Sequence, residues 1–263
     1  MELLTDTWRF PLEIVREAER QRAVLVLSAA SWHALEGARA GFLHAEEAAK
    51  LASAGVPKRQ ADYLRGRYCA KVAVAALAGD AGGADGAGAD GRAWQVAAGV
   101  FGQPVVRGAG LGNVQVSIAH SGDWAAALAC DEGHPMAVDI ELHDVAHGAT
   151  IRGEVADAEL AAFARAGWEA EMSLTFLWAA KEALGKVLRS GLMAPLSFYE
   201  VGEVERTAFG AVCTYRHFAQ YKSCCAKIGK LVVAIALPRK SALQFDWGAL
   251  TSVRVESGPT SAA

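Results

Sequence analysis

The chain has 263 residues, of which 52% are hydrophobic and 21% are charged, and its formal net charge is −3. This composition allows a sizeable core and excludes the strongly basic surface that is typical of nucleic-acid-binding proteins. No apolar run approaches the roughly 20 residues that span a bilayer. The first residues lack the features of a signal peptide, and the five cysteines form no C-x-x-C pair. We therefore expect a cytoplasmic, monomeric protein with reduced thiols.

The first half of the chain combines helical segments with short strands. Residues 1–22 give no clear pattern, whereas the glycine-rich stretch 79–91 predicts a mobile loop. Periodicity and turn residues predict helices over 45–53 and 58–77, strands near 24–27, 94–96, 114–120 and 124–130, and a turn at 101–104 that leads into a strand.

The second half repeats this composition. Its pattern predicts a strand around 137–141, helices over 157–166 and 169–188, strands near 197–205, 211–217 and 231–237, and a disordered tail over 256–263. In each half a long helix ends near a glycine and is followed by a loop and a short run of strands.

This similarity predicts an α+β fold of two subdomains related by a pseudo-twofold axis, each with helices packed on a small antiparallel sheet. We place the subdomains at residues 1–133 and 134–255, with the nucleotide on the first and the acidic strand on the second. A cleft between two such units is the expected place for a ligand.

Three acidic residues and a lysine form the most informative cluster. Residues four apart share a face of a helix, so Trp178, Glu182 and Lys186 lie in one row. Asp139 and Glu141 point to one face of their strand, roughly 6–7 Å apart. With Glu182 they would supply three oxygen ligands, which suits Mg²⁺ and a bound phosphate. The alternative is an exposed strand with two solvated acids.

Basic residues and one histidine are candidates for phosphate contacts. A lone histidine such as His120 is more often a hydrogen-bonded structural group than a phosphate donor. The basic residues between 58 and 67 would ordinarily form a solvated helix face. Arg67 is the exception that we favour, because it lies beside Gly66 within a motif.

The motifs resemble those of the surfactin-type 4′-phosphopantetheinyl transferases. The segments that carry the resemblance are Phe101-Gly102-Gln103-Pro104, Ser117-Ile-Ala-His120-Ser121-Gly122, Ala137-Val-Asp139-Ile-Glu141 and Trp178-Ala-Ala-Lys181-Glu182-Ala-Leu-Gly-Lys186. Upstream, Arg59 and Tyr63-Leu-Arg-Gly66-Arg67-Tyr are similar to the first helix motif of the enterobactin-synthetase branch. The matches follow the family's order over roughly residues 45–205.

The resemblance implies a Mg²⁺-dependent holo-[acyl-carrier-protein] synthase. Such an enzyme moves phosphopantetheine from coenzyme A to a serine of an apo acyl or peptidyl carrier protein and releases adenosine 3′,5′-bisphosphate. The implied roles are metal binding for Asp139, Glu141 and Glu182, catalysis for Glu182, Lys186 and a general base Glu159, and coenzyme A binding for Arg59, Arg67, Gly102, Gln103, Pro104, His120, Ser121, Lys181 and Lys186. Lys181 either reaches the phosphates or supports the site from outside.

Three positions depart from the family pattern. Ala137 replaces a glycine, Ala119 replaces a serine before the histidine, and Gln103 replaces the lysine of the turn. These departures leave two alternatives open. One is a carrier-protein or nucleotide-binding module without turnover, and the other is a Mg²⁺-dependent phosphohydrolase. We expect neither nucleic acid nor a membrane as a partner.

Overall fold

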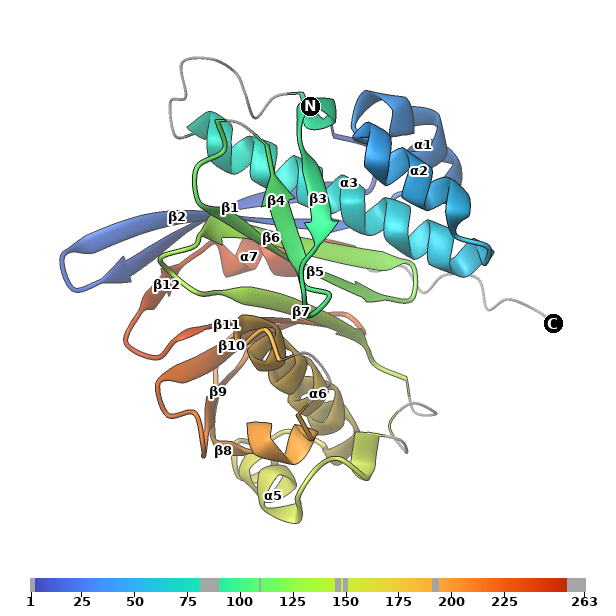
Figure 1. The fold of residues 1–263 in the computed structure, drawn as a ribbon. Helices are drawn as coiled ribbons and strands as arrows, with labels where there is room; N and C mark the ends of the chain where they lie inside the picture. The colour runs from blue at the N-terminus through green and yellow to red at the C-terminus, as the bar shows by residue number, and fades with distance from the viewer. Residues whose placement is uncertain are drawn as a thin grey trace.

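The computed structural model describes residues 3–80, 90–108, 110–144, 148, 151–190 and 194–254. Two five-stranded antiparallel sheets lie between two layers of helices, so the molecule has four layers (Figure 1). The mixed α+β architecture confirms the expected fold class. The tail over 256–263 and most of the glycine-rich stretch, residues 81–89, lie outside the described residues.

The first sheet has the strand order β12-β1-β2-β6-β5. Its faces are set by alternation along each strand: in β2, Val24 and Val26 face the helices, whereas Leu25 and Leu27 face the second sheet. The elements of this half are β1 (Thr7–Arg16), β2 (Glu19–Ser28), α1 (Trp32–Ala38), α2 (Ala45–Ser53), α3 (Pro57–Asp80), β3 (Gln95–Ala98), β4 (Pro104–Arg107), β5 (Val114–Ser121) and β6 (Trp124–Asp131).

The second sheet has the order β7-β11-β10-β9-β8 and carries its own helices on its outer face. Its strand β11 turns Val233 and Ile235 towards the first sheet and Ala234 towards α6. The elements are β7 (Ala137–Leu142), α5 (Asp157–Arg165), α6 (Ala170–Val187), β8 (Val201–Arg206), β9 (Gly210–Tyr215), β10 (Tyr221–Ile228) and β11 (Leu231–Pro238).

The two halves repeat one topology. In the first half β2 pairs with β6 and β6 with β5, and in the second half β7 pairs with β11 and β11 with β10. A long helix covers the central strand in both halves, and that strand presents small side chains to it. The small side chains are Ala125, Ala127 and Ala129 on β6, and Ala234 and Ala236 on β11. Small residues let a helix approach a sheet closely, so the same packing solution occurs twice.

The sheets meet along their edge strands β5 and β7, which we call the seam. There, the hydroxyls of two serines on β5 form hydrogen bonds with backbone groups of β7. Ser117 Oγ accepts from Val138 N at 3.2 Å and donates to Val138 O at 3.3 Å, and Ser121 Oγ accepts from Leu142 N at 2.9 Å. These bonds hold β7 on both sides of Asp139, which fixes the strand that carries the acidic pair.

The C-terminal segment returns to the first half. Strand β12 (Ala242–Gln244) pairs with β1, and α7 (Trp247–Thr251) contributes Leu250 to the core between the sheets. This segment was expected in the second half, and residues 1–22 carried no predicted element. Those residues contain most of the β1–β2 hairpin, in which Phe10, Leu12 and Ile14 are buried alternately.

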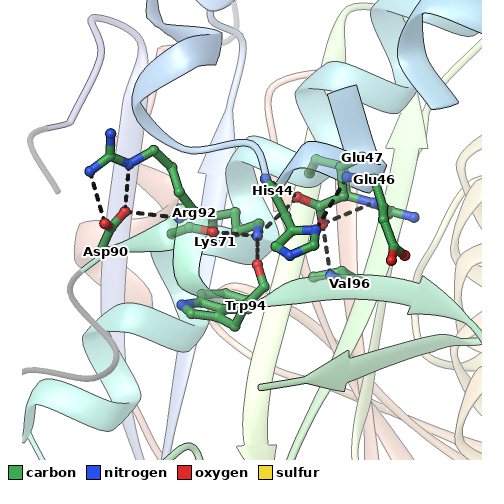
Figure 2. A network of polar contacts seen from close by, with 10 residues as sticks. His44, Glu46, Glu47, Lys71, Asp90, Arg92, Trp94 and Val96 are labelled. Atoms are coloured by element: carbon green, nitrogen blue, oxygen red, sulfur yellow. Dashed lines mark hydrogen bonds and ion pairs between the residues drawn. The ribbon is translucent and has the colours of Figure 1, made fainter. Parts of the chain in front are cut away.

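A buried ion pair connects α2, α3 and the β3–β4 hairpin (Figure 2). Glu47 lies at the third position of α2 and accepts from His44 N at 2.9 Å and from Val96 N at 2.7 Å. Lys71 Nζ lies 2.9 Å from Glu47 Oε2 and also donates to the carbonyls of Gly91 and Trp94. Both charged side chains are buried. Because β3 and β4 form a separate two-stranded sheet, these contacts help attach the hairpin to the body.

Candidate functional site

The candidate site lies at the seam, on the side where α6 packs over β7 and β11. Lys186, in the last turn of α6, donates to Asp139 Oδ1 at 2.7 Å and to the carbonyl of Val138 at 3.3 Å. It also donates to the carbonyl of Ile118, on β5, at 3.1 Å. One ammonium group therefore contacts both halves of the molecule, Ile118 in the first and Asp139 in the second.

Asp139 is almost completely buried, with 6% of its surface exposed. Burial raises the pKa of this carboxyl, and the ammonium of Lys186 works in the opposite direction. Its second oxygen, Oδ2, is buried without a hydrogen-bond partner in the described structure. A buried acceptor without a partner is costly, so this oxygen is available to a cation or a donor.

Glu141 and Glu182 are half-buried beside Asp139. Burial raises the pKa of Glu141 to about 7, and the negative charges of Asp139 and Glu182 add to the effect. Burial and then the charge of Asp139 raise the pKa of Glu182, which Lys186 partly offsets. These electrostatic effects place the three carboxylates near one another, whereas their convergence on one metal ion stays a prediction. No group of three or more His, Cys, Asp or Glu side chains in the described part of the chain is arranged to hold a metal ion as it stands.

A cavity of about 260 Å³ opens next to Lys186. The β3–β4 turn, Phe101 to Pro104, forms one wall, β5 forms another, and the end of α6 closes it. The side chain of Gln103 braces the turn, because its Oε1 accepts from Phe101 N at 3.0 Å. The predicted turn therefore borders a cavity beside the acidic cluster. The side-chain oxygen of Gln103 is bonded within the turn, to the amide of Phe101.

His120 lies on the same side of the seam. Its ring packs against Gly66 of α3, where an added Cβ would lie 2.4 Å from His120 Nε2. The residue as a whole is exposed, but the protein atoms around the ring disfavour its charged form and lower the pKa of the imidazole to about 4. The carboxylate of Asp62 opposes the shift and the nearby ammonium of Lys186 adds to it. His120 is therefore a neutral ring near Lys186 at pH 7.

Arg67 and Arg59, which the resemblance assigns to coenzyme A binding, are not among the described residues that line the cavity beside Lys186. The guanidinium of Arg67 lies 4.5 Å from the centre of the Tyr63 ring, and its Nε is 3.7 Å from Glu47. That Nε is buried without a hydrogen-bond partner in the described structure. Arg59 is exposed near the start of α3. Ser121 uses its hydroxyl at the seam, as described above.

Glu159 and Lys181 lie in the interior of the second half rather than at the cleft. Lys181 Nζ is 2.8 Å from Glu159 Oε2 and 3.0 Å from the carbonyl of Glu154, and both side chains are 1% exposed. Glu159 also accepts from Ala156 N at 2.9 Å and from Val201 N at 2.8 Å. A carboxylate with all these partners and no solvent is poorly suited to be the general base that the resemblance implied.

The Glu159–Lys181 pair is the counterpart of the Glu47–Lys71 pair. In both halves a glutamate at the third position of a short helix accepts from the residue before that helix and from a strand amide, and pairs with a buried lysine of the long helix. The duplicated contact points to a structural role, because the first half carries it without the acidic cluster.

Two polar groups near the candidate site, Arg189 and His143, are not among the residues predicted from the sequence. Arg189, just beyond α6, lines the cavity next to Lys186. His143 follows Glu141 by two residues, continues the pairing of β7 through His143 N to Lys230 O at 2.8 Å, and holds Thr175 of α6 through Nδ1 at 3.0 Å. Strand alternation from Asp139 and Glu141 could have placed His143 on their face.

Comparison with known families identifies the class of protein that this fold and site represent. Residues 135–236 match the 4′-phosphopantetheinyl transferase superfamily, and residues 46–103 match the 4′-phosphopantetheinyl transferase N-terminal domain. Together the two matches cover more than half of the chain and include Asp139, Glu182 and Lys186. The chain therefore belongs to the 4′-phosphopantetheinyl transferase superfamily, whose members are transferases.

No curated protein matches this chain significantly. Among the described residues, no helix is both long and apolar enough to cross a membrane. The surfactin-like and enterobactin-like branch, the cytoplasmic location and the monomeric state stay predictions.

Proposed function

We propose that this chain is a Mg²⁺-dependent enzyme that transfers 4′-phosphopantetheine from coenzyme A to a serine hydroxyl of an apo acyl or peptidyl carrier protein. The observation that carries the proposal is the contact of Lys186 with Asp139 at 2.7 Å beside a cavity of about 260 Å³. This contact joins a cation that lines the cavity to the acidic cluster where the two halves meet. Membership of the superfamily supports the same reaction.

Asp139, Glu141 and Glu182 are the residues that would hold Mg²⁺. They offer only oxygen ligands, which this hard cation prefers. The buried Oδ2 of Asp139 and the raised pKa of Glu141 are both features that a bound cation would relieve. Enclosing the ion requires rotation of these side chains, because they do not surround a metal position as they stand. Bound there, Mg²⁺ would neutralise charge on the pyrophosphate of coenzyme A.

The protein's own groups would position the reactants. In the transfer, the serine oxygen forms a bond to the phosphorus that carries pantetheine, and the bond from that phosphorus to the nucleotide's phosphate oxygen breaks. The serine proton passes to water, and adenosine 3′,5′-bisphosphate leaves. Lys186 would stabilise negative charge on the leaving phosphate. The one N–H of a neutral His120 faces the backbone of Asp62, so His120 would donate to a phosphate oxygen only after gaining a second proton or giving up that contact. We assign no general base, because Glu159 is buried away from the cleft.

The nucleotide would occupy the cavity beside the β3–β4 turn. Gly102, Gln103 and Pro104 border that cavity, and the backbone of a turn can approach a flat base closely. The interior position of Lys181 removes it from the expected phosphate contacts. Arg67 would reach the nucleotide only by leaving Glu47, so we give it a secondary role.

The direct test is to mix the protein with coenzyme A, Mg²⁺ and a panel of apo carrier proteins and to measure intact masses. We expect one carrier or more to gain about 340 Da, the mass of the transferred group. Coenzyme A binding without a mass gain would favour a binding module. Release of free phosphate from coenzyme A without carrier modification would favour a phosphohydrolase. The panel would also identify the carrier class.

A further inference from the structure

The cavity beside Lys186 contains a second cation that the family matches do not assign. Arg189 lines the same cavity, three residues beyond Lys186. None of the described residues that line the cavity is Asp or Glu. Both cations face carboxylates just outside the lining, Lys186 with Asp139 and Arg189 with Glu132, so an anionic ligand in the cavity would compete with these carboxylates for the two cations.

The two cations differ in how many donors they have to spare. Lys186 has three N–H groups and three acceptors, Asp139, Ile118 and Val138. The guanidinium of Arg189 uses only Nη2, which lies 3.1 Å from Gln115 Oε1 and 3.5 Å from Glu132. In the described part of the chain its Nε and Nη1 have no partner. Arg189 is therefore the cation with free donors in this cavity.

The ion pair between Arg189 and Glu132 does not explain the arginine at this position through stability. The two side chains are 46% and 56% exposed, and exposed pairs contribute little to stability. Such a pair can exchange its carboxylate for a phosphate, which an arginine binds through two parallel hydrogen bonds.

The backbone of Arg189 adds an independent observation. Its φ is +55°, in the left-handed region that glycine adopts freely and arginine rarely adopts. The position directly follows the Leu188 cap of α6, where glycine is the usual residue. An arginine here is tolerated despite its conformational cost, and strain of this kind points to a function of the side chain.

We propose that Arg189 binds a phosphate of the nucleotide half of coenzyme A, on the leaving-group side of the reaction. The inference rests on the proposed function, since it takes coenzyme A as the occupant of the cavity. Arg189 and Lys186 line the same cavity, so the phosphate next to Lys186 is the nearest candidate. It thereby becomes a specificity residue for the nucleotide.

Substitution by glycine separates this role from a structural one. Arg189→Gly removes the cation and also relieves the backbone, so the variant will fold with a Tm that is unchanged or raised by about 2–4 °C. Its Kd for coenzyme A, measured by calorimetry, will rise about 10- to 100-fold. Arg189→Ala will lose the same affinity without the gain in Tm, and Arg189→Lys will recover part of the affinity.

Two ligands identify the phosphate. If Arg189→Gly weakens coenzyme A and 3′-dephospho-coenzyme A by the same factor, Arg189 holds the 5′-side phosphate, as we infer. A loss confined to coenzyme A moves the contact to the 3′-phosphate and contradicts the leaving-group assignment. An unchanged Kd for both ligands, in a wild-type protein that binds and transfers, overturns the inference alone. A wild-type protein that binds neither coenzyme A nor inorganic pyrophosphate overturns both proposals.

Discussion

Lys186 Nζ lies 2.7 Å from Asp139 Oδ1, and this contact joins the last turn of α6 to the edge strand of the second sheet. The same ammonium reaches the carbonyl of Ile118 in the first half. The candidate site therefore depends on how the two halves meet, and not on either half alone.

The contact of α3 with His120 predicts opposite effects for two glycines of one helix. Gly66→Ala places a Cβ 2.4 Å from His120 Nε2, so it will displace the ring, lower stability and weaken coenzyme A binding. Gly79→Ala meets no atom within 4 Å and will stabilise the helix by about 0.5–1 kcal/mol. Urea unfolding of both variants checks the prediction, and equal effects of the two substitutions would contradict it.

The raised pKa of Glu141 predicts a fall in stability as pH rises. Its pKa is about 7 in the folded protein against 4.5 in the unfolded chain, so the folded state binds more protons between these values. The free energy of unfolding must then decrease across that window, by about 2 kcal/mol after allowance for partial exposure. His120, whose pKa is lowered, acts in the opposite direction, so the comparison with Glu141→Gln isolates the effect.

Melting temperatures from pH 4.5 to 8 in the presence of a chelator provide the measurement. Wild type will lose stability relative to Glu141→Gln as pH rises, and Mg²⁺ at pH 8 will stabilise wild type more than the variant. Parallel curves for the two proteins would show that Glu141 is not a strained carboxylate.

The duplicated buried ion pairs predict that Glu159 acts on stability and not as a base. Glu159→Gln and Glu47→Gln each leave a buried lysine without its counter-charge, so each will cost about 3 kcal/mol in urea unfolding. The residual transfer activity of Glu159→Gln will keep the pH profile of wild type. Lost turnover at full stability would instead restore the base role for Glu159.

The serine hydroxyls at the seam predict a weaker junction between the halves when they are removed. Ser117→Ala and Ser121→Ala each leave a β7 amide without its acceptor and will cost about 1–2 kcal/mol. Ser53→Ala, which removes an exposed hydroxyl bonded to Lys50 O, serves as the control with an effect near zero. Thermal unfolding measures all three, and a control as destabilised as the seam variants would refute the distinction.

The parts of the fold that local patterns dictate were predictable from the sequence. The alternation around Asp139 and the four-residue spacing of Glu182 and Lys186 gave both elements of the acidic cluster. The β1 strand was missed because Pro11 and several charged residues obscure the alternation of Phe10, Leu12 and Ile14. That alternation was present and could have been found.

The roles of single charged residues were harder to predict, because they depend on distant partners. Glu159 and Lys181 are 22 residues apart and meet only after α5 packs on α6. Arg67 lies within its motif, but its direction is set by Tyr63 and by Glu47 of another helix. The sequence around Arg189 contains no motif that indicates ligand binding. Its one unusual feature is that arginine, and not glycine, follows the end of the helix. Spacing alone does not specify such contacts.

The most direct test of the central claim is transfer by Asp139→Asn and Glu182→Gln under saturating coenzyme A, Mg²⁺ and apo carrier, followed by intact mass. Asp131→Asn, at the end of β6, provides the surface control, and circular dichroism confirms folding of each protein. The account predicts that wild type and the control modify the carrier, whereas the two site variants lose at least 100-fold in rate, about 3 kcal/mol. Carrier modification at the wild-type rate by folded Asp139→Asn or Glu182→Gln would contradict it.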